Sequence, residues 1–255
     1  MPTTPAFFAL YKCEFHKLSL FMHLLALLTG STPLSRTHMK TFLSIGTGPG
    51  IGFATAERFA REGYRVVLSA RNMDRTLALA ERLISQGYEA HTRQVDASNA
   101  QDVAALVTQA EAQFGALDVL HYNAAIIRQA TVAEQPVDTF NSDLAVNIGG
   151  ALVATQTALR SMYSRNAGTL LLTGGFFGIT PNPDFLSLSL GKAGIRSLAL
   201  GLFEPAKTQG VHAATVTVAA FVKPESEEAL GVAEAFWTLH SQPKENWTAE
   251  VTFSR

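Results

Sequence analysis

A chain of 255 residues with 47% hydrophobic residues and 19 glycines can form one large α/β domain or two small ones, and it carries too little charge for a disordered protein. A formal net charge of −1 and the lack of a basic stripe argue against nucleic acid or a membrane surface as a partner. The single cysteine, Cys13, excludes an internal disulfide and favours a reducing compartment, and the spacing of the histidines predicts no metal site.

The first 38 residues differ from the rest of the chain. Lys12 and Lys17 precede an apolar run over residues 18–28, which resembles a signal peptide and is short for a membrane span. The alternative, which we favour, is that residues 1–38 are an N-terminal extension outside the folded unit. The sequence after it is typical of a cofactor-using cytosolic protein. We therefore expect a single domain over residues 39–255, located in the cytoplasm.

From Thr41 onward, short apolar strands alternate with amphipathic helices. The predicted strands are 42–45, 65–69, 90–95, 118–122, 169–173, 213–218 and a short edge strand at 250–253. The predicted helices are 54–61, 75–85, one around 103–114, about 137–162, about 186–207 and 228–239. This alternation, with right-handed crossovers, predicts a Rossmann-like, doubly wound parallel β-sheet with helices on both faces, in three α/β/α layers.

The turn after the first strand is rich in glycine, over residues 45–52 (IGTGPGIG). Glycine tolerates positive φ and lets the backbone approach a pyrophosphate, which then rests on the free N–H groups of the following helix. The spacing G-x-x-x-G-x-G fits Gly46, Gly50 and Gly52, whereas the third glycine of G-x-G-x-x-G would fall on Ile51. Because no G-K-[ST] follows, hydrolysis of a nucleoside triphosphate is disfavoured. The turn therefore predicts a dinucleotide site.

The end of the second strand indicates which dinucleotide binds. An acidic residue there would hold the ribose hydroxyls of NAD, whereas an arginine would accommodate the 2′-phosphate of NADP. The strand ends Ser69-Ala70-Arg71-Asn72, and the first carboxylate comes only at Asp74. Since guanidinium pairs well with phosphate, NADP(H) is the predicted cofactor, and NAD(H) is the alternative.

With these residues the chain resembles the short-chain dehydrogenase/reductase family, from about Lys40 to Val222. The glycine turn matches T-G-x-x-x-G-x-G with Ile45 in place of Thr, and residues 117–125 (LDVLHYNAA) match L-D-x-L-x-N-N-A-G. Asp96 matches the acidic residue that usually meets the adenine ring. The resemblance assigns cofactor binding to Gly46, Gly48, Gly50, Ile51, Gly52, Ser69, Arg71, Asn72, Asp96, Asn123, Ala124, Lys192 and Val222.

The resemblance also implies hydride transfer between the nicotinamide and a carbonyl or alcohol carbon. Lys192 matches the lysine of Y-x-x-x-K, and Asn147 matches the helix asparagine that helps to hold a water in a proton relay. We assign these two residues as catalytic. Leu188 occupies the position of the tyrosine and Gly175 that of the serine. The usual proton donor and the hydroxyl that orients the substrate are therefore both missing.

Three interpretations of this degenerate site remain. A substitute acid could come from Ser187, Ser189, Tyr122 or Thr173; the protein could bind NADP(H) without turnover, as a sensor, scaffold or partner subunit; or it could be a slow reductase, since general acid catalysis contributes only about 10²–10⁴-fold. We predict an atypical NADP(H)-dependent oxidoreductase with weak activity. Leu188 favours a small apolar carbonyl or alcohol substrate. The two long helices are where family members usually associate, so a homodimer or homotetramer is expected.

Overall fold

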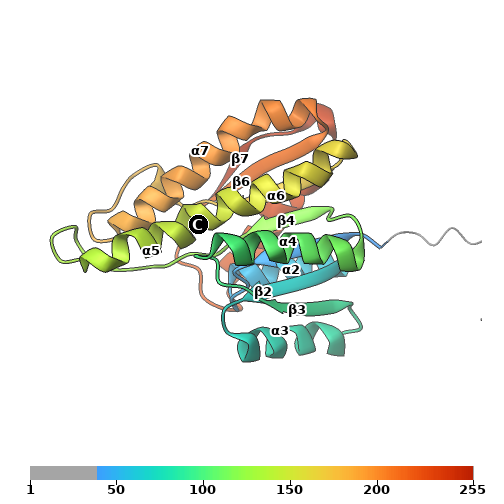
Figure 1. The fold of residues 1–255 in the computed structure, drawn as a ribbon, viewed down its shortest axis with the longest axis horizontal. Coiled ribbons are helices and arrows are strands. Elements are labelled where there is room, and N and C mark those ends of the chain that lie inside the picture. Colours follow the sequence, from blue (N-terminus) through green and yellow to red (C-terminus); the bar gives the residue numbers. More distant parts are fainter. Residues whose placement is uncertain (1–38, 255) are drawn as a thin grey trace, which may run out of the picture. The chain divides into compact units, whose positions relative to one another are not determined.

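A computed structural model describes residues 39–254, and the expected extension over residues 1–38 lies outside the described residues. The described chain forms a seven-stranded sheet in the order β3-β2-β1-β4-β5-β6-β7, in which all neighbouring strands are parallel (Figure 1). The strands are Thr41–Ile45 (β1), Arg65–Ala70 (β2), Ala90–Gln94 (β3), Val119–Tyr122 (β4), Gly168–Thr173 (β5), Val211–Ala219 (β6) and Glu250–Ser254 (β7). The predicted doubly wound sheet is confirmed.

Helices cover both faces of this sheet. They are Ile51–Arg61 (α2), Met73–Ser85 (α3), Ala100–Phe114 (α4), Phe140–Leu144 (α5), Gly150–Ser164 (α6), Leu186–Thr208 (α7) and Glu227–Ser241 (α8). Helices α4, α6 and α7 share one buried cluster with the sheet, and they lie in front of the strands in Figure 1. Helices α2, α3 and α8 share the other cluster. The protein thus has two apolar cores, one on each face of the sheet.

Alternation along the strands supplies both cores at once. Every side chain of β1 is buried; Leu43 and Ile45 point to the α4–α6–α7 face, whereas Phe42 points to the opposite face and stacks on Phe59 of α2, with ring centroids 4.4 Å apart. A strand buried on both faces shows no alternation of apolar and polar residues, and the two polar side chains of β1, Thr41 and Ser44, are buried as well.

The helix expected over 137–162 is not continuous. A 3₁₀ turn at Val137–Thr139 leads into α5, a π-helical turn at Ala145–Gly149 follows, and α6 begins at Gly150. The π turn coincides with two long-range contacts: Asn147 hydrogen-bonds the backbone of Ile126, and a Cβ at Gly150 would lie 2.4 Å from Tyr122 Oη. Apolar periodicity cannot reveal one extra residue in a turn, because the faces before and after it still look helical.

The carboxyl ends of β1, β4, β5 and β6 meet at one edge of the sheet, where ligands bind in folds of this type. Helix α5 and the first turns of α7 extend past the strand ends on the left of Figure 1, and η3 (Phe176–Gly178) follows β5 there. Helix α7 is also long and apolar enough to pass a length-and-composition test for a membrane span, a test that core helices pass as well. In this fold α7 packs on β6.

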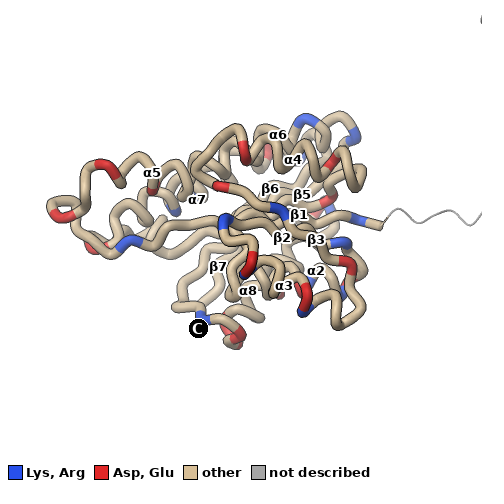
Figure 2. The backbone as a smooth tube through the Cα atoms, turned by 60° about the horizontal axis from the view of Figure 1, so that its bottom comes forward, with Lys and Arg blue, Asp and Glu red and all other residues tan. Residues whose placement is uncertain are grey.

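Charged residues of both signs are intermixed over the described chain (Figure 2). Arg58 on α2 shows how they are used, since its Nε lies 2.6 Å from Glu234 Oε2 on α8 and its Nη1 lies 2.5 Å from Glu62 Oε1. On the edge strand β7, Glu250 pairs in the same way with Arg196 of α7, at 2.9 Å. These pairs attach helices and the edge strand to their neighbours.

Candidate functional site

The glycine turn is shaped by two glycines and left open by two others. Gly46 has a φ of +84°, and a Cβ there would lie 2.4 Å from Ala124 Cα; a Cβ at Gly52 would lie 3.0 Å from Thr47 Cα. A Cβ at Gly48 would meet no atom within 4 Å, and one at Gly50 would meet nothing nearer than 4.0 Å. Gly46 and Gly52 are therefore required by packing, whereas Gly48 and Gly50 border open space.

The helix that follows this turn begins without a side-chain cap. Gly50 is the N-cap of α2, no side chain hydrogen-bonds there, and the first turn carries no acidic residue. Ile51 packs partly against the apolar core and anchors the helix end. An N-terminus in this state offers N–H groups and the positive end of the helix dipole to an anion. Together with the open space at Gly48 and Gly50, it fits the pyrophosphate of a dinucleotide.

Ser69 and Thr47 hold the turn from the inside. The N–H groups of Gly46 and Thr47 donate to Ser69 O at 2.8 and 2.9 Å. The hydroxyls of Ser69 and Thr47 donate to Ser44 O at 2.7 and 3.2 Å, and the side chain of Ser69 is fully buried. Ser69, assigned to the cofactor from sequence, thus contacts the loop that would bind it. Sequence reasoning missed Thr47, although a threonine directly after the required glycine Gly46 was a usable signal.

The ends of β2 and β3 place Arg71 near Asp96. Arg71 is exposed directly after β2, and Asn72 Oδ1 accepts a hydrogen bond of 3.0 Å from Arg75 N, which caps α3. Asp96 Oδ1 accepts from Ser98 N at 2.9 Å and from Ser98 Oγ at 2.7 Å. These hydrogen bonds, and then the charge of Arg71, lower the pKa of Asp96. A cation and a hydrogen-bonded carboxylate therefore stand side by side at this end of the sheet.

Asn123 and Lys192 meet around Thr173. Asn123 Nδ2 donates to Gly46 O at 2.8 Å, and Thr173 Oγ1 donates to Asn123 Oδ1 at 3.0 Å. Lys192, from α7, donates through Nζ to Thr173 O at 2.7 Å. Burial lowers the pKa of Lys192 to about 8. The structure thus brings two residues assigned from sequence into one network with the glycine turn.

Lys192 is flanked by a glycine and an apolar side chain. A Cβ at Gly175 would lie 3.3 Å from Lys192 Cγ, so the lysine stem runs past the position where the family keeps a serine. Leu188 lies one helical turn before Lys192 on α7 and is 7% exposed. Neither residue can donate a proton. The surroundings of Lys192 on this side are therefore aliphatic.

Asn147 ties the π turn to the segment after β4. Its Oδ1 accepts from Ile126 N at 2.6 Å, and its Nδ2 donates to Ile126 O at 3.1 Å. A Cβ at Gly191 would lie 2.3 Å from Asn147 Cβ, so α7 contacts the π turn next to Lys192. Both polar atoms of the Asn147 side chain therefore hold the π turn against the segment after β4.

The hydroxyls considered as substitute acids donate to other protein atoms. Tyr122 Oη donates to Val146 O at 2.6 Å, and burial raises its pKa. Ser187 Oγ donates to Asp143 Oδ2 at 3.0 Å, and Ser189 Oγ to Phe185 O at 3.0 Å. Thr173, described above, donates to Asn123. The geometry gives no support to a substitute hydroxyl as proton donor.

The segment after β6, which includes Val222, lies beside the glycine turn. A Cβ at Gly50 would be 4.0 Å from Lys223 O, and Val222 packs partly against α2 and α8. Glu225, at a φ of 59°, pairs with Arg82 of α3 at 2.9 Å. Within residues 39–254, no group of three or more His, Cys, Asp and Glu side chains is placed to hold a metal ion.

Residues 40–230 match the family model of the short chain dehydrogenases. The chain belongs to the short-chain dehydrogenase/reductase family. It is 30% identical over 187 residues to a glucose 1-dehydrogenase of Gluconobacter oxydans, covering 72% of this chain and 70% of that protein. It is 28% identical over 223 residues to an uncharacterized oxidoreductase of Staphylococcus aureus, covering 84% and 96%.

Solved structures agree with this assignment. A short-chain dehydrogenase from Mycobacterium smegmatis is 26% identical and superimposes with a TM-score of 0.78, covering 85% of this chain and 92% of that one. A metagenomic short-chain oxidoreductase in complex with NADP has the same fold, with a TM-score of 0.78 at 23% identity, covering 84% of this chain and 96% of that one. Short-chain dehydrogenases/reductases are oxidoreductases that bind a nicotinamide dinucleotide.

Proposed function

We propose that this protein is an NADP(H)-dependent oxidoreductase of carbonyl or alcohol compounds in which Lys192 alone supplies the proton. The observation that carries the proposal is the position of Lys192 Nζ, 2.7 Å from Thr173 O, in the network that also holds the glycine turn. The lysine thereby lies at the strand ends where the cofactor's reactive ring belongs in this fold.

Arg71 supports the choice of NADP(H) over NAD(H). Its guanidinium is exposed at the end of β2, where a 2′-phosphate would lie, and its charge already acts on Asp96. The pyrophosphate would rest on the uncapped start of α2 between Gly48 and Gly50, and Lys192 would contact the nicotinamide ribose. When bound, the reduced cofactor supplies a hydride to the substrate carbon.

Lys192 would complete the reaction at the substrate oxygen. As the new C–H bond forms, its ammonium group gives a proton to the oxygen, an O–H bond forms, and the resulting neutral amine takes a proton back from water. A pKa of about 8 places this group near the working pH, which general acid catalysis requires. Because Leu188 and Gly175 provide neither a phenol nor an orienting hydroxyl, turnover is slow.

The substrate is proposed to be small and apolar. Each of three neighbouring strands is followed by an exposed apolar side chain at this edge of the sheet: Ile127 after β4, Phe176 after β5 and Phe221 after β6. Leu188 adds an aliphatic wall near Lys192. Contact between this apolar rim and an apolar ligand would remove apolar surface from water and so favour binding.

NADPH titration by fluorescence, followed by NADPH consumption with a panel of apolar aldehydes and ketones, tests the proposal. Lys192→Ala should abolish turnover, whereas Lys207→Ala, at the far end of the same helix, should leave it unchanged. Turnover in Lys192→Ala equal to that of the parent protein would remove Lys192 from the mechanism.

A second function is NADP(H) binding without turnover. It is favoured by one observation: the two positions beside Lys192 are occupied by Leu188 and Gly175, neither of which can donate a proton. NADPH binding with no consumption across the panel would support a sensor, scaffold or partner subunit. The double variant Leu188→Tyr, Gly175→Ser then asks whether chemistry can be restored. The glycine position tolerates a Cβ, because its nearest neighbours are the flexible methylenes of Lys192.

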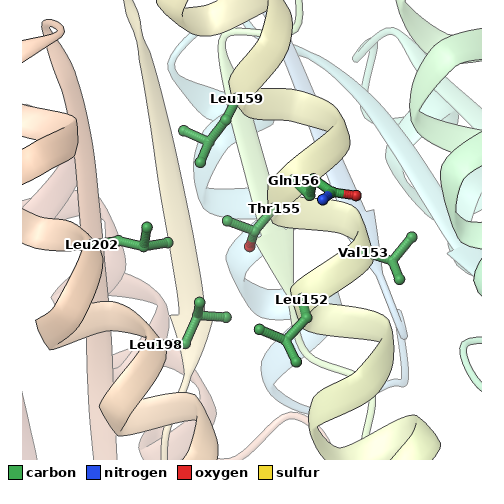
Figure 3. Close-up of a pocket in the computed structure, with 7 residues that line it drawn as sticks. All are labelled: Leu152, Val153, Thr155, Gln156, Leu159, Leu198 and Leu202. Carbon is green, nitrogen blue, oxygen red and sulfur yellow. The ribbon is translucent and has the colours of Figure 1, made fainter.

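We further propose that the protein forms a homodimer or homotetramer through α6 and α7. A shallow groove of about 420 Å³ lies between these helices, lined by Leu152, Val153, Thr155, Gln156, Leu159, Leu198 and Leu202 (Figure 3). Leu152 is 49% exposed. A second copy would cover this leucine-rich surface, as in other members of the family. Leu152→Lys should lower the mass seen by analytical ultracentrifugation; an unchanged mass would move the interface elsewhere.

Two further proposals concern the whole chain. We place the folded unit at residues 39–255 and the protein in the cytoplasm. A chain starting at Met39 should melt cooperatively and bind NADPH like the full-length protein. Loss of folding on this truncation would show that residues 1–38 belong to the domain.

A further inference from the structure

A buried histidine is linked to the glycine turn by three consecutive hydrogen bonds. His121, on β4, is fully buried, and its Nε2 lies 3.0 Å from Thr173 Oγ1. Thr173 Oγ1 lies 3.0 Å from Asn123 Oδ1, and Asn123 Nδ2 lies 2.8 Å from Gly46 O. The chain runs from the core of the sheet to the turn that would hold the pyrophosphate.

The donors and acceptors of this chain allow only one direction. Gly46 O can only accept, so Asn123 must present its NH₂ group to Gly46 and its oxygen to Thr173. Thr173 has a single hydroxyl hydrogen, which it must donate to Asn123. Thr173 Oγ1 can then only accept a hydrogen bond from His121, so His121 must carry its proton on Nε2.

The other ring nitrogen explains why His121 stays in this form. Nδ1 is buried without a hydrogen-bond partner, in a ring that packs against Phe42 and Phe236, with centroids 5.8 and 4.7 Å away. A proton on Nδ1 would be a buried donor with no acceptor. Burial, and the charge of Lys192, lower the pKa of His121 to about 3. The ring is therefore neutral at physiological pH.

We propose that His121 is a positioning residue, whose neutral Nε2–H form orients Thr173 and thereby the Asn123 carboxamide that holds the glycine turn. In the opposite tautomer, Nε2 would accept, Thr173 would turn its hydrogen toward the histidine, and Asn123 Oδ1 would lose its donor. The carboxamide could then turn over and place its oxygen against Gly46 O. The effect on ligand binding rests on the proposed NADP(H) function.

NADPH affinity, measured by fluorescence titration, tests the chain. His121→Leu and Thr173→Val should each weaken NADPH binding about three- to tenfold, the worth of a typical hydrogen bond. The double variant should bind NADPH no more weakly than the single variant of lower affinity, because both substitutions break the same chain of hydrogen bonds. His121→Gln, whose side-chain NH₂ reaches as far as Nε2, should recover most of the affinity, whereas the shorter His121→Asn should not.

His212→Leu is the matched control. His212 is also fully buried in a strand and has an unpartnered Nδ1, but its Nε2 bonds Thr248 O at 2.9 Å, away from the glycine turn. This variant should lose thermal stability and keep its NADPH affinity. Equal losses of affinity in His121→Leu and His212→Leu, or equal rescue by Gln and Asn, would overturn the proposal.

A cofactor-independent measurement separates this inference from the proposed function. Nitrogen-15 NMR of the histidine rings, in the protein without cofactor at pH 7, should show the neutral Nε2–H form for the resonance that disappears in His121→Gln. An Nδ1–H form or an imidazolium would refute the chain even if NADPH binds. Failure of the parent protein to bind NADPH would instead refute the proposed function. The NMR measurement would still report the tautomer of His121 in that case.

Discussion

Asp143 on α5 is predicted to hold the segment after β4 against the start of α7. Its carboxylate is fully buried and accepts hydrogen bonds from Arg128 Nε and Nη2 at 2.8 and 3.0 Å, from Gln135 Nε2 at 3.1 Å and from Ser187 Oγ at 3.0 Å. These partners come from the segment after β4 and from the start of α7. Asp143→Ala therefore removes the acceptor that both segments share.

The cost follows from which donors lose their acceptor. Ser187 and Gln135 are buried, and an unsatisfied buried donor costs about 1–3 kcal/mol. Gln135 Nε2 also donates to Thr139 Oγ1 at 3.1 Å, and Arg128 can reach water, so the expected loss lies in the lower part of the combined range, about 2–4 kcal/mol. NADPH affinity should not change, because Asp143 makes no contact with the glycine turn.

Urea unfolding of the protein without cofactor measures this loss, with Asp138→Ala, an exposed aspartate on the adjoining turn, as control. The hydrogen bond from Arg128, above all, lowers the pKa of Asp143. A carboxyl whose pKa is lowered by folding stabilises the folded state fully at any pH above its unfolded-state pKa. This stabilisation is lost only as the pH falls further, through the folded-state pKa. The gap between parent and variant should therefore be equal at pH 7 and pH 5. A gap that vanishes by pH 5, or one shared by Asp138→Ala, would refute the reasoning.

Three further predictions concern the cofactor cleft and acid stability. Arg71→Ala should weaken NADPH binding at least tenfold and NADH binding hardly at all, in paired fluorescence titrations; equal losses would exclude a phosphate contact. Gly46→Ala should unfold at a lower temperature, because its Cβ would lie 2.4 Å from Ala124, whereas Gly48→Ala should melt normally and bind NADPH more weakly. Burial lowers the pKa of His240 to about 4, so the neutral ring stabilises the fold above pH 6.5 and this stabilisation is lost as pH falls toward 4. The free energy of unfolding of the parent protein, measured in urea, should therefore fall by roughly 2–3 kcal/mol more over that range than that of His240→Gln. Identical pH profiles of the two proteins would contradict this.

Much of the fold could be predicted from local pattern. Strands such as Arg65–Ala70 and helices such as Met73–Ser85 lie within two residues of their predicted bounds. Their signals, the spacing of apolar residues and caps such as Asn72, depend only on residues that are close in the sequence. Helix α2 begins at Ile51, three residues before the predicted start at 54, since its first turn is made of glycine-rich sequence with little helical signal.

For the candidate site, the sequence indicated residues but not how they contact one another. The positions of Asn123 and Lys192 followed from motifs, but their meeting at Thr173 depends on β4, β5 and α7 coming together, which no local pattern encodes. The inward orientation of Tyr122 and the burial of His121 have the same cause. A side chain at the end of a strand can face the cleft or the core, and only the packed partners decide which.

The short connection between β6, which ends at Ala219, and α8, which begins at Glu227, has a kinetic consequence. Because this connection is short, and Glu225 pairs with Arg82 of α3, we expect that the segment does not close as a lid over the cleft. Under the proposed function, product would then leave without a closing segment having to open first. Turnover should then be limited by the chemical step, and a deuteride at the transferred position should slow it visibly.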